Sequence, residues 1–153
     1  MLSQETINKI KETVNEFFQK TTLDVSIEFL PEQEGTIPIN ITSEEPQILI
    51  GEGGQTLIEI QRLLKLALKK KVSEEFYVDL DVNNYKKKKI EYIKEMARSE
   101  ADNVAITKTE KELAPMPAYE RRIVHLELLN RSDVVAESIG QDPERRIVIK
   151  PRP

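Results

Sequence analysis

Cysteine and tryptophan are absent from the 153 residues, and histidine occurs once. The absence of cysteine excludes disulfide bonds and cysteine-ligated zinc and is typical of a reducing compartment. A single histidine also excludes a metal site built from several histidines. The chain begins with a polar segment and has no apolar run near the length of a membrane span, so we find neither a signal peptide nor a transmembrane helix. We therefore expect a cytoplasmic protein that uses no metal and no cofactor.

Charge is abundant but unevenly divided along the chain. Charged residues make up 33% and the net charge is −4. Residues 1–82 hold 8 Lys/Arg against 15 Asp/Glu, a net charge of −7, whereas residues 83–153 hold 15 against 12, a net charge of +3. This division suggests two units with different surfaces. Local basic patches, rather than the net charge, decide whether a protein can contact phosphate.

The first 82 residues alternate between helical and strand patterns. Ser3 can cap a helix that carries apolar residues at helical spacing as far as Phe18. Polar and apolar residues alternate over residues 24–30 and 36–41, which predicts two strands around a turn at 31–35, and Pro38 suggests that the second strand lies at an edge or contains a bulge. A short helical turn near residues 43–50, an amphipathic helix after residue 54 and a strand at 76–82 complete this part.

The remaining residues predict a second unit of the same class. Asn83-Asn84 marks the expected boundary, because asparagine is a poor helix former and a helix from Tyr85 to about Val104 follows. The prolines at 115 and 117 precede a helix over 118–129, and strands at 134–138 and 145–149 flank a turn. The predicted fold is α+β with two small domains. Residues 1–83 have the order α-β-β-α-α-β and residues 84–153 the order α-β-α-β-β, with helices packed on largely antiparallel sheets.

The sharpest local feature is the tetrad Gly51-Glu52-Gly53-Gly54, which precedes the amphipathic helix. Glycines let a backbone approach a ligand closely, and the free amides at a helix N-terminus favour an anion such as phosphate. Many helices also begin after a glycine-rich turn without binding anything, and this interpretation stays open.

Residues 36–82 resemble a KH domain, a nucleic-acid-binding module whose Gly-x-x-Gly loop clamps the nucleotide backbone. The resemblance implies that Gly51 and Gly54 are the loop glycines and that Ile48 and Ile50 line an apolar groove. Such loops commonly hold a basic residue between the glycines, whereas this chain has Glu52 and Gly53. A carboxylate in contact with a phosphate costs about 1 kcal/mol in watery surroundings. Either the loop binds weakly, or the domain serves protein contacts, or the nearby basic residues Arg62 and Lys65 compensate.

A second candidate site lies in the stretch from Glu120 to His125. Arg121 and His125 are four residues apart, so on a helix they project from one face, next to Arg122. A guanidinium grips phosphate and an imidazole can hydrogen-bond or stack, which together predict a single-strand contact. The alternative is an exposed pair on a solvated helix. The run Lys86–Lys89 is likewise either a phosphate contact or a solvated face.

Residues 115–126, together with 138–140 and 145–149, resemble an R-3-H domain, which is named for its Arg-x-x-x-His pair and is associated with single-stranded nucleic acid. Arg145 and Arg146 occupy adjacent strand positions and face opposite sides, so at most one of them can join the face of Arg121 and His125.

A KH unit followed directly by an R-3-H unit is similar to the Jag (SpoIIIJ-associated) family, over about residue 24 to the C-terminus and most strongly over 117–149. Relatives often carry an additional N-terminal Jag domain, which we do not recognise in this sequence. The resemblance implies an RNA-binding regulator of cell elongation and division, and some members pair with a small single-KH protein. The expected partners are single-stranded RNA or DNA, a small single-KH protein or a second copy of the chain, with no membrane and no small-molecule substrate.

An enzyme finds little support in the sequence. There is no cysteine nucleophile, His125 has no neighbouring Asp or Ser, and the glycine loop lacks the Gly-Lys-Ser/Thr ending of an ATP-binding loop. The competing hypothesis is a protein-interaction or dimerisation scaffold that binds nucleic acid weakly or only through its second domain.

Overall fold

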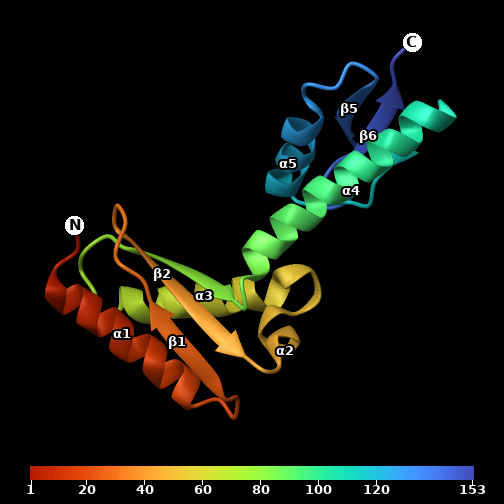
Figure 1. Ribbon diagram of the computed structural model, residues 1–153. Coiled ribbons are helices and arrows are strands. Elements are labelled where there is room, and N and C mark those ends of the chain that lie inside the picture. The colour runs from red at the N-terminus through yellow and green to blue at the C-terminus, as the bar shows by residue number, and fades with distance from the viewer. The chain divides into compact units, whose positions relative to one another are not determined.

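The computed structural model describes residues 1–153, which form two compact units, residues 1–86 and 87–153. Each unit contains one three-stranded sheet packed against helices (Figure 1). The predicted α+β class is therefore confirmed. None of the helices combines the length and the apolar composition that crossing a lipid bilayer requires.

The first unit is a helix-covered sheet with one parallel strand pair. Its elements are α1 (Gln4–Gln19), β1 (Val25–Phe29), β2 (Thr36–Ser43), α2 (Pro46–Ile50), a 3₁₀ turn (Glu52–Gly54), α3 (Gln55–Lys69) and β3 (Tyr77–Val82). The strand order is β1-β2-β3, in which β1 and β2 are antiparallel whereas β2 and β3 are parallel. Parallel strands need a crossover connection. Helices α2 and α3 form that connection, and the glycine tetrad lies within it.

Helices α1 and α3 bury one apolar face each against the sheet. The Ser3 Oγ accepts a hydrogen bond from the Thr6 amide at 3.2 Å, so Ser3 caps α1 as its position predicts. The fully buried side chains of this core come from both helices and from β2 and β3: Ile10, Val14, Ile37, Ile39, Ile41, Leu64, Leu68, Leu80 and Val82. The helical and two-residue periodicities of the sequence therefore correspond to the faces that meet in the core.

Pro38 lies in the central strand, so the prediction of an edge position is wrong. The Leu30 amide donates to the Pro38 carbonyl at 2.9 Å, but proline has no N–H for the reciprocal bond. This missing bond falls where β1 has already ended at Phe29, so only the last position of the ladder is affected. The two-residue turn of Glu34 and Gly35, both with positive φ, then closes the hairpin.

The second unit packs two helices on an antiparallel sheet. Its elements are α4 (Tyr85–Thr107), whose first two residues belong to the first unit, β4 (Lys111–Glu112), α5 (Ala118–Leu128), β5 (Val134–Ile139) and β6 (Arg146–Pro151). The strand order is β4-β6-β5. The core joins one face of α4 to α5 and the sheet through the buried residues Ile93, Ala97, Ala101, Val104, Val124, Leu128, Val134, Ile147 and Ile149.

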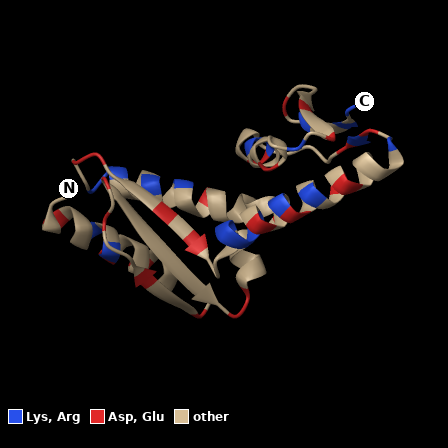
Figure 2. Cartoon of the chain, turned by 45° about the horizontal axis from the view of Figure 1, so that its top comes forward, with Lys and Arg blue, Asp and Glu red and all other residues tan.

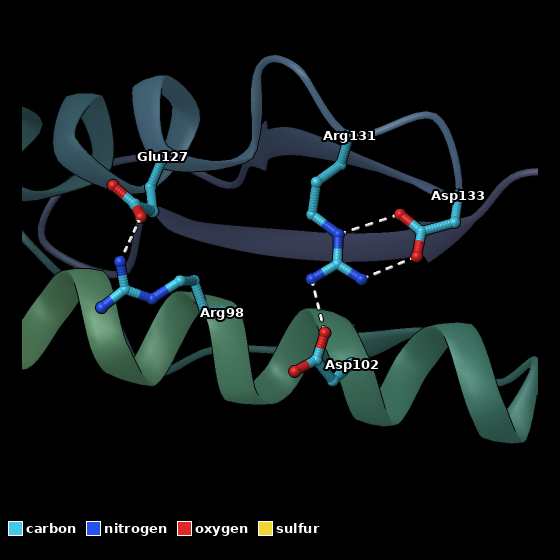
Figure 3. A network of polar contacts seen from close by, with 5 residues as sticks. All are labelled: Arg98, Asp102, Glu127, Arg131 and Asp133. Atoms are coloured by element: carbon cyan, nitrogen blue, oxygen red, sulfur yellow. Dashed lines mark hydrogen bonds and ion pairs between the residues drawn. The ribbon is translucent and has the colours of Figure 1, made fainter.

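A polar network fastens α4 to α5 and to the turn that follows it (Figure 3). Arg98 of α4 pairs with Glu127 of α5 at 2.7 Å. Arg131 donates to Asp102 of α4 at 2.6 Å and, with a second nitrogen, to Asp133 at 2.6 Å. These bonds raise the pKa of Arg131 and lower the pKa of Asp133 to about 2. The network engages Arg98 and Arg131 in intramolecular ion pairs.

Candidate nucleic-acid interface

The glycine tetrad forms a tight turn between α2 and α3. Gly51, Gly53 and Gly54 all have positive φ, at 72°, 60° and 80°. Side chains rarely adopt this backbone region. Gly51 also has ψ −179°, a combination that is essentially restricted to glycine. The sequence therefore needs glycines here to connect the two helices.

Two of the glycines are also required by close packing. A Cβ at Gly51 would lie 2.1 Å from Thr56 Oγ1, and a Cβ at Gly54 would lie 3.0 Å from the ring of Tyr85. A Cβ at Gly53 would meet open space. The ring of Tyr85, the first residue of α4, therefore packs directly against Gly54. The sequence alone did not predict this role, because it depends on a contact between Gly54 and a residue 31 positions later in the chain.

The turn presents backbone donors at the start of α3. Gly54 is the N-cap of α3 and forms no side-chain cap, and the first turn of α3 contains no acidic residue. The Gln55 amide donates to the Glu52 carbonyl, so the amides that follow Gln55 are the ones available to an anion, with the partial positive charge of the helix dipole behind them. Glu52, which is exposed, lies just before this turn and opposes an anion there.

Arg62 and Lys65 do not contact Glu52. Arg62 pairs with Glu59 at 3.2 Å, and the Lys65 Nζ lies 5.2 Å from the centroid of the Tyr77 ring. At 1.5 Å per residue, they lie about 12 Å and 16 Å along α3 from Gly54. Neither is positioned to compensate the carboxylate of Glu52 by direct contact.

Arg121 is buried rather than presented to solvent, which differs from the exposed pair that helical spacing suggested. Only 8% of Arg121 is exposed. Its Nη1 donates to the Met116 carbonyl at 2.7 Å and lies 3.5 Å from Asp142 Oδ1. Arg121 therefore ties α5 to the segment that precedes it and to the turn between β5 and β6.

Arg122 and His125 are the more accessible members of the α5 motif. Arg122 is exposed and forms no ion pair. His125 is half-buried, and its Nε2 lies 3.0 Å from the Ser138 Oγ on β5. This hydrogen bond orients the ring against the sheet, while Arg122 keeps its guanidinium free for a ligand.

Arg145 and Arg146 meet different parts of the unit. The Arg145 carbonyl accepts from the Met116 amide at 3.2 Å, so its backbone joins the segment that Arg121 also contacts. The Arg145 Nε is buried without a hydrogen-bond partner. Arg146 instead pairs through Nε with Glu112 of β4 at 2.8 Å. Arg145 thus has unused hydrogen-bonding capacity, whereas Arg146 is engaged within the sheet.

Of the four lysines at the start of α4, two lie near carboxylates and two are exposed. Lys86 pairs with Asp79, and Lys89 lies 4.0 Å from Glu120. Lys87 and Lys88 are exposed. Basic and acidic residues then alternate along the helix (Figure 2), so α4 as a whole is a mixed-charge surface.

Comparison with known proteins adds to this geometry. Residues 91–151 match the R-3-H domain family. The RNA-binding protein KhpB of Clostridium symbiosum is 38% identical over 127 residues, which cover 83% of this chain and 57% of that protein. KhpB of Bacillus subtilis (strain 168) is 34% identical over 128 residues, covering 82% of this chain and 60% of the relative. KhpB of Lactiplantibacillus plantarum is 32% identical over 111 residues, covering 72% and 34%.

The extent of these matches matters as much as their identity. The chain spans between 34% and 60% of the length of these curated relatives. A match of 127 residues is longer than the second unit, residues 87–153, can hold. The similarity therefore extends into the first unit, where the glycine turn lies.

Proposed function

The chain belongs to the KhpB (Jag) family of R-3-H domain proteins, and we propose on that basis that it binds single-stranded RNA as a regulator and acts by binding rather than by catalysis. The observation that carries this proposal is the R-3-H match over residues 91–151, combined with relatives named RNA-binding proteins whose similarity extends into both units. The basic excess of the second half and the free guanidinium of Arg122 provide the phosphate contacts.

The proposed contact surface of the R-3-H unit consists of Arg122, His125 and Arg145, with Arg121 as the residue that holds α5 in place. Arg122 contacts a phosphate, and His125 supplies a ring next to it for hydrogen bonding or stacking. Arg145 is half-buried and forms no ion pair, which supports a role for its terminal guanidinium nitrogens toward a ligand.

We propose that the first unit is a KH domain. The support is the parallel pair β2 and β3, connected through α2, the glycine turn and α3, and the uncapped start of α3. In this proposal the amides that follow Gln55 hold one backbone phosphate, and the Glu52 carboxylate weakens that contact.

Membership of the family supports further proposals about location, cellular role and partners. The protein acts in the cytoplasm, where it takes part in the control of cell elongation and division. It binds single-stranded DNA as a secondary ligand, because the proposed contacts do not read a 2′-hydroxyl. A small single-KH protein or a second copy of the chain is its protein partner.

Fluorescence anisotropy with the Arg122→Ala variant tests the contact surface. The variant should bind a labelled single-stranded RNA more weakly and reduce the slope of log K against log salt by about 0.7, the value for one phosphate of a single strand. Lys20→Ala removes one positive charge from the exposed residue that follows α1 and serves as the control. Equal losses in both variants, or no loss in either, would refute the assignment of Arg122.

A scaffold function is the second candidate, favoured by exposed apolar side chains on α3. Leu63 and Leu66 are 55% and 56% exposed, and Ile58 is 47% exposed. Exposed apolar side chains in this number on one helix suit a protein interface. Light scattering of the chain with and without RNA separates the two candidates: a stable dimer that binds no RNA would favour the scaffold.

A further inference from the structure

The R-3-H unit contains a cavity that the Arg122 and His125 surface does not use. It has a volume of about 430 Å³ and opens between α4 and the segment from β4 to α5. This volume lies within the range of small-ligand pockets. Its lining includes Tyr92, Met96, Leu113, Met116 and Glu120, and neither Arg122 nor His125 belongs to it.

A buried carboxylate lies in the wall of this cavity. Glu120 is only 7% exposed, although a charged side chain is rarely buried without a close partner. The Tyr119 hydroxyl donates to Glu120 Oε1 at 3.1 Å, and the Lys89 Nζ lies 4.0 Å from the same oxygen. Both contacts are to Oε1, so Oε2 is left for a ligand, and Oε1 can accept a second hydrogen bond beside that of Tyr119.

The usual structural role of such a residue is not open to Glu120. A glutamate in the third position of a helix can accept a hydrogen bond from the amide of the N-cap residue. The N-cap of α5 is Pro117, which has no N–H. The carboxylate therefore does not cap α5 in this way.

The charges around the cavity select the kind of group that can enter it. Glu100, Glu112 and Glu120 line it, against Lys89 and Lys111. A phosphate would meet an excess of carboxylates. A neutral ring with N–H donors suits an ionised carboxylate, which only accepts hydrogen bonds. Guanine has two such donors side by side, N1–H and the N2 amino group, and they match the two oxygens of a carboxylate.

The apolar part of the lining suits an aromatic ring. Tyr92 is 63% exposed, and the Lys89 Nζ lies 5.9 Å from the centroid of its ring. Nucleobases stack on such rings in many single-strand-binding proteins. Met96 and Met116 are flexible and polarizable, so they can adapt to the other face and edge of a base.

We propose that this cavity binds one unpaired base of a single-stranded RNA, with guanine preferred, through stacking on Tyr92 and hydrogen bonds to Glu120. Lys89 and Lys111 contact the flanking phosphates. This inference rests on the proposed RNA binding and adds base selection to it. The phosphate surface gives affinity for any single strand, and the cavity gives a preference at one position.

Anisotropy titrations of the full chain with short oligouridine RNAs that differ only at one central position test the proposal. We expect guanine to bind about fivefold or more tightly than uracil at that position, as for a good bidentate pair, with inosine between them because it lacks the N2 amino group. Glu120→Gln should abolish the preference for guanine over uracil. Glu91→Gln changes an exposed carboxylate beside Tyr92 and should keep the preference.

The exposed Tyr92 allows a second variant in case Glu120→Gln does not fold. Tyr92→Ala should lose the preference for guanine, and Tyr92→Phe should keep it. Equal affinity of the wild type for guanine and uracil, or a preference that survives in Tyr92→Ala and in a folded Glu120→Gln, would overturn the base site while leaving RNA binding intact. If the wild type binds none of the RNAs, the proposed function itself fails.

Nucleosides, which have no phosphate, separate the cavity from the phosphate surface. Guanosine added to methyl-labelled protein should shift the methionine methyl resonances of Met96 and Met116 in NMR spectra, whereas uridine should not. Absence of these shifts with guanosine, or equal shifts with both nucleosides, would contradict the proposal.

Discussion

Neighbouring residues of one type perform different tasks in this protein, and the two arginines of the α5 motif are the clearest example. Arg121 is buried and donates to the Met116 carbonyl, whereas Arg122 is exposed and unpaired. Helical spacing predicted that Arg121 and His125 share a face. It did not indicate which of two adjacent arginines would be buried, because that depends on the segments that contact α5.

Arg121→Ala should therefore destabilise the protein. The substitution leaves the partly buried Met116 carbonyl without its donor, which typically costs about 1–3 kcal/mol. Arg122→Ala should leave the stability nearly unchanged. Urea unfolding of both variants measures the difference. If Arg121→Ala is as stable as the wild type but no longer binds RNA, Arg121 is a direct ligand contact and the structural assignment is wrong.

The glycines of the turn allow a matched comparison. Gly53→Ala adds a Cβ into open space and pays only for the positive φ, about 1–2 kcal/mol. Gly51→Ala meets the same kind of strain and also a contact at 2.1 Å with Thr56 Oγ1, so it should be clearly less stable than Gly53→Ala. Thermal unfolding checks the order. Equal stabilities would mean that the turn relaxes freely around Gly51.

At the scale of elements, the network that fastens α4 to α5 should make stability depend on pH. Arg131 lowers the pKa of Asp133 from 3.8 to about 2 through paired hydrogen bonds. The pKa of Asp133 is lower in the folded state than in the unfolded state. The stabilisation by the Arg131–Asp133 pair is therefore fully present above the pKa of the unfolded state and is lost as the pH falls from about 4 to about 2.

Asp133→Asn should therefore lessen the loss of stability over this pH range and lower the stability at neutral pH. Chemical unfolding at a series of pH values, followed by circular dichroism, measures both effects. Glu95→Gln, at an exposed carboxylate of α4, is the control and should follow the wild type. If the stability of Asp133→Asn changed with pH as that of the wild type does, the network would add no pH-dependent stability.

The sequence was sufficient to predict most elements and insufficient for the way in which some of them pair. Alternation and helical spacing locate β1, β3, α1 and α3, since each has one buried face. Pro38 misled because its missing donor matters only in relation to a partner strand. The predicted element order already contained a strand between α4 and α5, and β4 confirms it, but a strand of two residues has no pattern that could locate its bounds. Pairing partners and ladder ends are properties of the assembled sheet.

At the scale of the whole molecule, some features of the candidate sites could be predicted from the sequence and others could not. The glycine turn and the α5 motif could be recognised from spacing within a few residues. Tyr85 behind Gly54 and Glu120 in the cavity wall could not, because their importance depends on contacts between elements that are distant in the chain. The uneven charge of the two halves is likewise visible in the sequence, but the individual partners of Arg62, Lys65 and Arg146 are not.

A change of charge in the glycine turn tests whether the first unit contributes to RNA binding in the intact chain. Glu52→Lys should strengthen RNA binding severalfold, because it replaces a repulsive contact with an attractive one next to the amides of α3. Glu28→Lys makes the same change of charge on an exposed position of β1 and should have a smaller effect. Equal effects, measured by anisotropy at one salt concentration, would show that the turn does not approach phosphate.

The most direct test of single-strand RNA binding is an anisotropy titration of the intact chain against single-stranded RNA, single-stranded DNA and duplex RNA at two salt concentrations. We predict that single-stranded RNA binds most tightly and that its affinity falls as salt increases, because phosphate contacts release counterions. Single-stranded DNA should bind next and duplex RNA most weakly. An absence of binding to all three at low salt would contradict the RNA-binding function and favour a protein scaffold.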